Sequence, residues 1–89
     1  MPAERRRHER RNVSLEAVFQ SSGGGRVAAR LTDLSLGGAF LETDEPPTFG
    51  STIAVFVTFP GSTRETEIGC TVRWRHGDGV GVQFGMLRA

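Results

Sequence analysis

Apolar side chains recur at every second position in several short runs of this chain, and this pattern constrains the fold more than any other feature. The first run, residues 13–20, places Val13, Leu15, Ala17 and Phe19 on one side. Such alternation is typical of a β-strand with one buried face. Further strands are predicted over residues 26–31, 38–43, 53–59, 64–76 and 80–84.

Glycine and proline separate these runs. Residues 21–25 form a serine-glycine loop, residues 44–50 contain Pro46 and Pro47, and residues 77–79 are typical of a tight hairpin turn. No window of the sequence supports a helix of ten residues or more. Six short strands with turns between them predict an all-β fold, either a small antiparallel barrel or a sandwich. A closed barrel is favoured because closure leaves no unpaired strand edge.

Two of the runs carry specific expectations about burial. In residues 53–59, Ala54 and Phe56 are apolar in addition to the alternating apolar positions of the run. This strand is therefore expected to be buried on both faces. In residues 64–76, Trp74 is in phase with the apolar positions of its run. Core packing is therefore favoured for Trp74. The alternative is a place at a ligand mouth, where the indole could stack on a base.

Length and composition exclude several classes of protein. With 89 residues the chain has room for one small domain. Its longest uninterrupted apolar run, residues 53–57, is far shorter than the roughly 20 residues of a membrane span. Residues 1–11 carry charges where a signal peptide needs apolar residues, so a cytoplasmic location is expected.

Catalytic and metal-binding groups are also missing from the sequence pattern. Cys70 is the only cysteine, which excludes a disulfide framework. His8 and His76 have no partners at the spacing of metal ligands, so no metal site is expected. No Ser/His/Asp or Cys/His grouping and no pair of clustered carboxylates is evident, so the chain is not expected to be an enzyme.

The net charge is only +1, but the basic residues are unevenly distributed. All eleven are arginine, and five of them fall within the first eleven positions: Arg5, Arg6, Arg7, Arg10 and Arg11. Guanidinium groups so close together repel one another, and an anion with several oxygens, such as phosphate, is their favoured partner. Arginine also matches the O6 and N7 acceptors of guanine and can stack on a base. The alternative interpretation is a solvated, flexible terminus.

A second group of polar residues lies between the second and third predicted strands, in the segment DLSLGG at residues 33–38. Asp33 and Ser35 are two positions apart and would project to the same side of an extended chain. Gly37 and Gly38 would allow a positive φ and a close backbone approach. A carboxylate beside a hydroxyl can bind the edge of a guanine, which offers N–H donors beside the O6 acceptor. A turn in which Asp33 and Ser35 cap backbone N–H groups is the alternative.

Together, the two groups resemble the motifs of the PilZ family. Residues 5–10 match the motif RRxxxR, and residues 33–38 match [D/N]xSxxG at the spacing of the family. Members of this family are bacterial receptors for the second messenger cyclic di-GMP. The resemblance covers nearly the whole chain, since residues 34–43 and the closing hairpin from Val72 to Phe84 are also similar to family members.

The resemblance implies a six-stranded PilZ-type barrel over residues 13–85, a flexible arginine-rich arm over residues 1–12 that lies across its mouth, and a short tail over residues 86–89. In this family the motif arginines clamp phosphates and guanines, the motif Asp and Ser contact a guanine, and the motif Gly lets the backbone turn beneath it. The implied ligand-binding residues are Arg5, Arg6, Arg10, Asp33, Ser35 and Gly38, with Arg7, Arg11, Gly37 and Trp74 as further candidate contacts.

Two features leave alternatives open. The register Arg6, Arg7 and Arg11 fits the arginine motif equally well, although the earlier register keeps Glu4 just before the arginines, as in many family members. Many members also have a helix after the last strand, whereas residues 86–89 can form no more than a turn, so no substantial C-terminal helix is expected. A partner, for example another copy of the barrel in a homo-oligomer, could then cover the exposed apolar end.

The sequence therefore predicts a non-catalytic receptor for cyclic di-GMP that needs no cofactor. It would pass the signal to a protein partner, whose identity the sequence does not indicate, by ordering of the arm. A PilZ-like adaptor that does not bind nucleotide is the main alternative. Nucleic-acid binding through the arm is less favoured, because the rest of the chain has six arginines against eight acidic residues, no lysine and few exposed aromatic residues.

Overall fold

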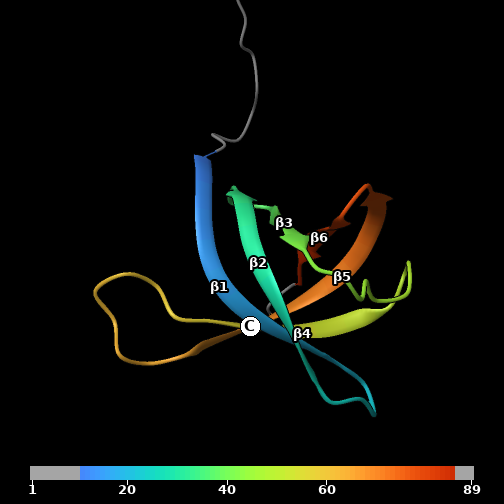
Figure 1. The fold of residues 1–89 in the computed structure, drawn as a ribbon, viewed down its shortest axis with the longest axis horizontal. Helices are drawn as coiled ribbons and strands as arrows, with labels where there is room; N and C mark the ends of the chain where they lie inside the picture. Colours follow the sequence, from blue (N-terminus) through green and yellow to red (C-terminus); the bar gives the residue numbers. More distant parts are fainter. Residues whose placement is uncertain (1–10, 86–89) are drawn as a thin grey trace, which may run out of the picture.

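The computed structural model describes residues 11–85 and contains six strands (Figure 1). They are β1 (Arg11–Ser21), β2 (Arg26–Leu34), β3 (Gly38–Glu42), β4 (Thr52–Val57), β5 (Thr66–His76) and β6 (Gly79–Phe84). All pairings are antiparallel, and the strands close into a barrel in the order β1-β2-β3-β6-β5-β4. The predicted six-stranded antiparallel barrel is therefore confirmed. Residues 11–85 include no helix that could cross a membrane.

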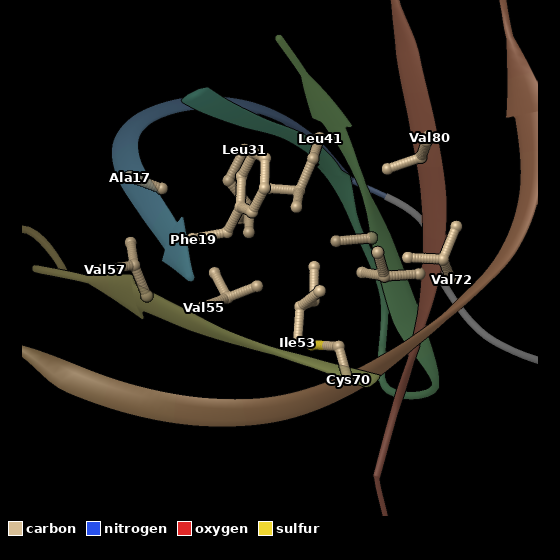
Figure 2. Close-up of a cluster of buried hydrophobic side chains, with 12 residues drawn as sticks. Ala17, Phe19, Leu31, Leu41, Ile53, Val55, Val57, Cys70, Val72 and Val80 are labelled. Carbon is tan, nitrogen blue, oxygen red and sulfur yellow. The ribbon is translucent and has the colours of Figure 1, made fainter. Parts of the chain in front are cut away.

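The interior of the barrel is a single apolar core to which every strand contributes (Figure 2). The alternation predicted for β1 is present, since Ala17 and Phe19 are buried while Ser14 and Glu16 are exposed. No polar or charged side chain is buried among the described residues. The core consists of Ala17, Phe19, Leu31, Ala39, Leu41, Ile53, Val55, Val57, Cys70, Val72, Val80 and Val82.

The outer face of β4 differs from the prediction. Ala54 and Phe56 were expected to be buried, but both are only half-buried. A closed barrel has one interior, and no second layer of the described chain covers the outside of β4. The guanidinium of Arg26 lies 4.1 Å from the centroid of the Phe56 ring, in a cation–π contact that partly covers it.

The alternation along β5 is broken by a β-bulge, and this changes the position of Trp74. Val72 pairs with Val82, but Trp74 pairs with Gly81, so Arg73 is the additional residue between them. An inserted residue shifts the following side chains to the opposite face of the strand. Trp74 is consequently 48% exposed on the outer face, and the prediction that it packs in the core is wrong.

The glycine opposite Trp74 makes room for the indole. A Cβ on Gly81 would overlap the Trp74 ring, so the indole lies directly on the backbone of β6. The hairpin that joins these two strands is as short as predicted, because only Gly77 and Asp78 separate them. Gly77 has a φ of 53°, a conformation that glycine adopts without strain.

Candidate functional site

The end of β2, the β2–β3 turn, and strands β3, β5 and β6 together form an open depression on the outside of the barrel. Its volume is about 640 Å³, within the range of roughly 300–1,000 Å³ that is usual for ligand pockets. Register places Phe40, Gly81 and Trp74 in one row across β3, β6 and β5. The lining residues are Asp33, Ser35, Gly37, Gly38, Ala39, Phe40, Arg73, Trp74, His76, Val82 and Gln83.

Asp33 lies near the end of β2, in a backbone conformation that the sequence analysis did not predict. Its φ is 52°, so the chain is not extended at this position. The prediction that an extended backbone places Asp33 and Ser35 on the same side is therefore wrong. Both residues nevertheless line the depression. Asp is one of the few residues that tolerate the left-handed region, because its short side chain can form local hydrogen bonds.

Ser35 closes the turn between β2 and β3. Its backbone N–H donates to the carbonyl oxygen of Gly38 at 2.9 Å, and its hydroxyl donates to the same oxygen at 3.3 Å. The alternative interpretation had this hydroxyl accept from a backbone N–H group, but it donates to a carbonyl oxygen in this turn. Because the proton of Oγ points to Gly38, the Oγ lone pairs are available to accept a hydrogen bond from a ligand.

Gly38 is required for close packing. A Cβ at this position would overlap the carbonyl oxygen of Val82 on β6, which confirms the predicted close backbone approach. The positive φ expected for the glycine pair is found at Asp33 and not at Gly38. The N–H of Phe84 also donates to the carbonyl oxygen of Gly37 at 2.9 Å. Two contacts with β6 thus fix the position of the turn.

Aromatic residues form the other side of the depression. Phe40 and His76 make an edge-to-face contact, with ring centroids 6.4 Å apart and an interplanar angle of 71°. Trp74 is the largest exposed ring in this region and can offer a face to a planar ligand.

Sequence reasoning missed six of the lining residues: Ala39, Phe40, Arg73, His76, Val82 and Gln83. The position of Phe40 between the buried Ala39 and Leu41 was a usable signal, because alternation places it on the outer face. The β5 bulge gave no comparable signal.

The first motif precedes the described part of the chain. Arg5, Arg6, Arg7 and Arg10 lie outside the described residues, as does the tail over residues 86–89. The backbone of Arg11 is described, and it pairs with Leu34, next to Asp33. Strand β1 therefore begins beside the segment that contains Asp33.

The chemistry of the depression suits binding. Its side chains offer hydrogen-bond acceptors from Asp33 and Ser35, aromatic faces, and a guanidinium from Arg73. Within residues 11–85, no group of three or more His, Cys, Asp or Glu side chains is arranged to hold a metal ion.

Comparison with protein families shows the family to which the chain belongs. The family model described as the PilZ domain matches residues 4–89, which is nearly the whole chain. The chain belongs to the PilZ domain family. PilZ domains are non-catalytic receptor domains that typically bind cyclic di-GMP.

A solved structure has the same fold. The PilZ barrel described here superimposes on the Bacillus subtilis inhibitor of motility, MotI/DgrA, with a TM-score of 0.71 and 18% sequence identity. The alignment covers 98% of this chain and 45% of that protein, so this PilZ chain spans less than half of its length. A comparison with curated proteins gives no significant match.

Proposed function

We propose that this PilZ domain is a receptor for cyclic di-GMP that binds the dinucleotide in the depression beside the β2–β3 turn. The observation that carries the proposal is the placement of the second motif. Asp33, Ser35 and Gly38 line one depression together with Trp74, although Trp74 is 36 positions after Gly38 in the sequence. A guanine base requires both a polar edge and an aromatic face, and this depression supplies both.

The turn can recognise the guanine edge. The carboxylate of Asp33 and the lone pairs of Ser35 Oγ are acceptors, whereas N1–H and N2–H of guanine are donors. Gly38 contributes by allowing the turn to lie against β6, as described above. Trp74 stacks on the base, an interaction worth about 1–3 kcal/mol per base in other nucleotide-binding proteins.

The arginine arm supplies the contacts with the phosphates. Arg5, Arg6 and Arg10 bind phosphates and guanines, with Arg7 and Arg11 as supporting charges. The pairing of Arg11 with Leu34 supports this role, because it joins the arm to the barrel next to Asp33. Binding of the dianionic ligand offsets much of the positive charge of the arm and orders it over the depression. The ordered arm is then the signal that a protein partner reads.

The test is calorimetric titration of the purified chain with cyclic di-GMP, and separately with GTP and a short RNA. Saturable binding of cyclic di-GMP alone is expected. Arg10→Ala and Asp33→Asn should each weaken it about tenfold or more, because each removes a charge-assisted hydrogen bond. Asn is the better replacement for Asp33, since it tolerates the backbone conformation at this position.

The adaptor function makes the opposite prediction. A folded chain that gives no heat with cyclic di-GMP would exclude the receptor function. Binding of RNA with a steep dependence on salt and no preference for cyclic di-GMP would instead favour nucleic-acid binding by the arm.

A further inference from the structure

We infer that Arg73 is a ligand-binding residue of this depression and contacts a phosphate of the bound dinucleotide. Arg73 belongs to neither PilZ motif, and the sequence pattern alone gave it no role. The inference rests on the proposed function, because it assigns a further contact within the same site.

The β-bulge places Arg73 beside Trp74 at the depression. Consecutive residues of a regular strand point to opposite faces, so an arginine and a tryptophan next to each other would normally be separated by the sheet. In β5 the bulge breaks this rule, and both Arg73 and Trp74 line the depression. A stacking surface and a cation are thus adjacent, which matches a nucleotide with its base and its phosphate.

Arg73 is not engaged by other parts of the described chain. The guanidinium of Arg26 lies 3.4 Å from a carboxylate oxygen of Glu65, and that of Arg30 donates to Ser14 Oγ at 3.0 Å. Arg73 is exposed and makes no hydrogen bond or ion pair with any side chain in residues 11–85. Its donors can therefore bind a ligand without first breaking an interaction within the barrel.

Arg73 and the guanine-binding acceptor Asp33 lie at opposite ends of the depression, on strands that are not neighbours. The β2 strand, where Asp33 lies, and the β5 strand of Arg73 are three strand spacings apart in the barrel, or about 14 Å along the sheet. A ligand that contacts both residues must carry N–H donors for Asp33 and an anionic group for Arg73 on one rigid framework. Cyclic di-GMP has this combination, and the planar guanidinium can bind a phosphate through two parallel hydrogen bonds.

The experiment compares Arg73→Ala with Arg75→Ala in the full chain. Arg75 is a matched control because it lies on the same strand, carries the same charge, is exposed and does not line the depression. Titration with cyclic di-GMP is expected to show binding weakened at least about tenfold by Arg73→Ala. Arg75→Ala should bind within about twofold of the unmodified chain, because an exposed charge outside the site is screened. Arg73→Lys should retain part of the affinity, since it keeps the charge and loses the planar fork.

A second readout separates contact with the ligand from positioning of Trp74. The emission of Trp74, the only tryptophan, is measured without ligand in each variant. Unchanged emission in Arg73→Ala together with weakened binding supports direct contact. A shifted emission maximum would assign Arg73 to positioning of the indole and would overturn the inference.

The outcomes also separate this inference from the proposed function. If the unmodified chain binds cyclic di-GMP and the two alanine variants bind equally well or equally weakly, Arg73 makes no specific contact and only the inference fails. If the folded, unmodified chain does not bind cyclic di-GMP, the proposed function fails and the inference fails with it.

Discussion

At the residue scale, Asp33 contributes both a side chain to the depression and an unusual backbone conformation to the turn. Its carboxylate lines the depression, while its backbone has a φ of 52°. The left-handed conformation costs most residues about 1–2 kcal/mol, and Asp and Asn less. An alanine at this position would therefore remove the carboxylate and strain the turn at the same time.

Comparing Asp33→Ala with Asp33→Gly isolates the backbone contribution, because both substitutions remove the same carboxylate. The alanine variant is expected to have a free energy of unfolding about 1 kcal/mol lower than that of the glycine variant. Urea denaturation without ligand measures the difference. An alanine variant as stable as the glycine variant would show that the turn relaxes to another conformation.

Gly38 is the second motif residue whose identity the packing of the barrel explains. A methyl group there would overlap the Val82 carbonyl oxygen, and backbone atoms on both sides leave little room to adjust. Gly38→Ala is expected to lower the free energy of unfolding by about 1–3 kcal/mol in the absence of ligand. Gly69→Ala is the matched control, because a Cβ on Gly69 would have no neighbour within 4 Å. Equal stability of the two variants would contradict the close approach.

At the scale of elements, the β5 bulge determines which residues form the site. Alternation predicted the inward positions Cys70 and Val72 correctly, since both are buried. It failed at Trp74, because one inserted residue reverses the faces of the strand after it. Bulges depend on pairing with the neighbouring strand, and a single strand read by itself does not reveal them. Gly81 lies opposite the indole, and its lack of a side chain leaves the space that Trp74 occupies on the outer face.

The contact between Trp74 and Gly81 gives a prediction about both strands. Gly81→Ala should displace the indole from the backbone of β6, because the new methyl group would occupy the position of the ring. The fluorescence of Trp74 is then expected to shift to longer wavelength, as the indole moves into water. Binding of cyclic di-GMP should weaken with it if Trp74 stacks on a base. Gly69→Ala should leave the emission maximum unchanged, and a Gly81→Ala spectrum identical to that of the unmodified chain would refute the contact.

At the scale of the whole molecule, the fold followed from the sequence and the site followed only in part. Short alternating runs divided by glycine and proline are sufficient to indicate six strands, and closure follows because a sheet this small would otherwise expose both edges. The site depends on interactions between strands that are distant in sequence. The approach of Gly38 to Val82 and the place of Trp74 on Gly81 arise from the register of β6 with its two neighbours. The alternation of apolar residues within one strand does not predict the register between strands.

The closed barrel also makes Cys70 a probe of the whole molecule. Cys70 is 1% exposed in the single core, and burial raises the pKa of its thiol from 9.0 to about 12. The thiolate is the reactive form, so at pH 8 the folded chain should resist alkylation. Reaction then requires opening of the core, and its rate reports the population of unfolded chains when reclosing is fast.

Ligand binding should therefore protect Cys70, although Cys70 does not line the depression. A ligand that binds only the folded chain lowers the unfolded population by the factor 1 + [L]/Kd. At a concentration of cyclic di-GMP 100 times its Kd, the alkylation rate at pH 8 is expected to fall about 100-fold. GTP at the same concentration should leave the rate unchanged. A rate that cyclic di-GMP does not alter, in a chain shown by titration to bind it, would mean that Cys70 becomes accessible through local opening of β5, and the barrel would then not unfold as one unit.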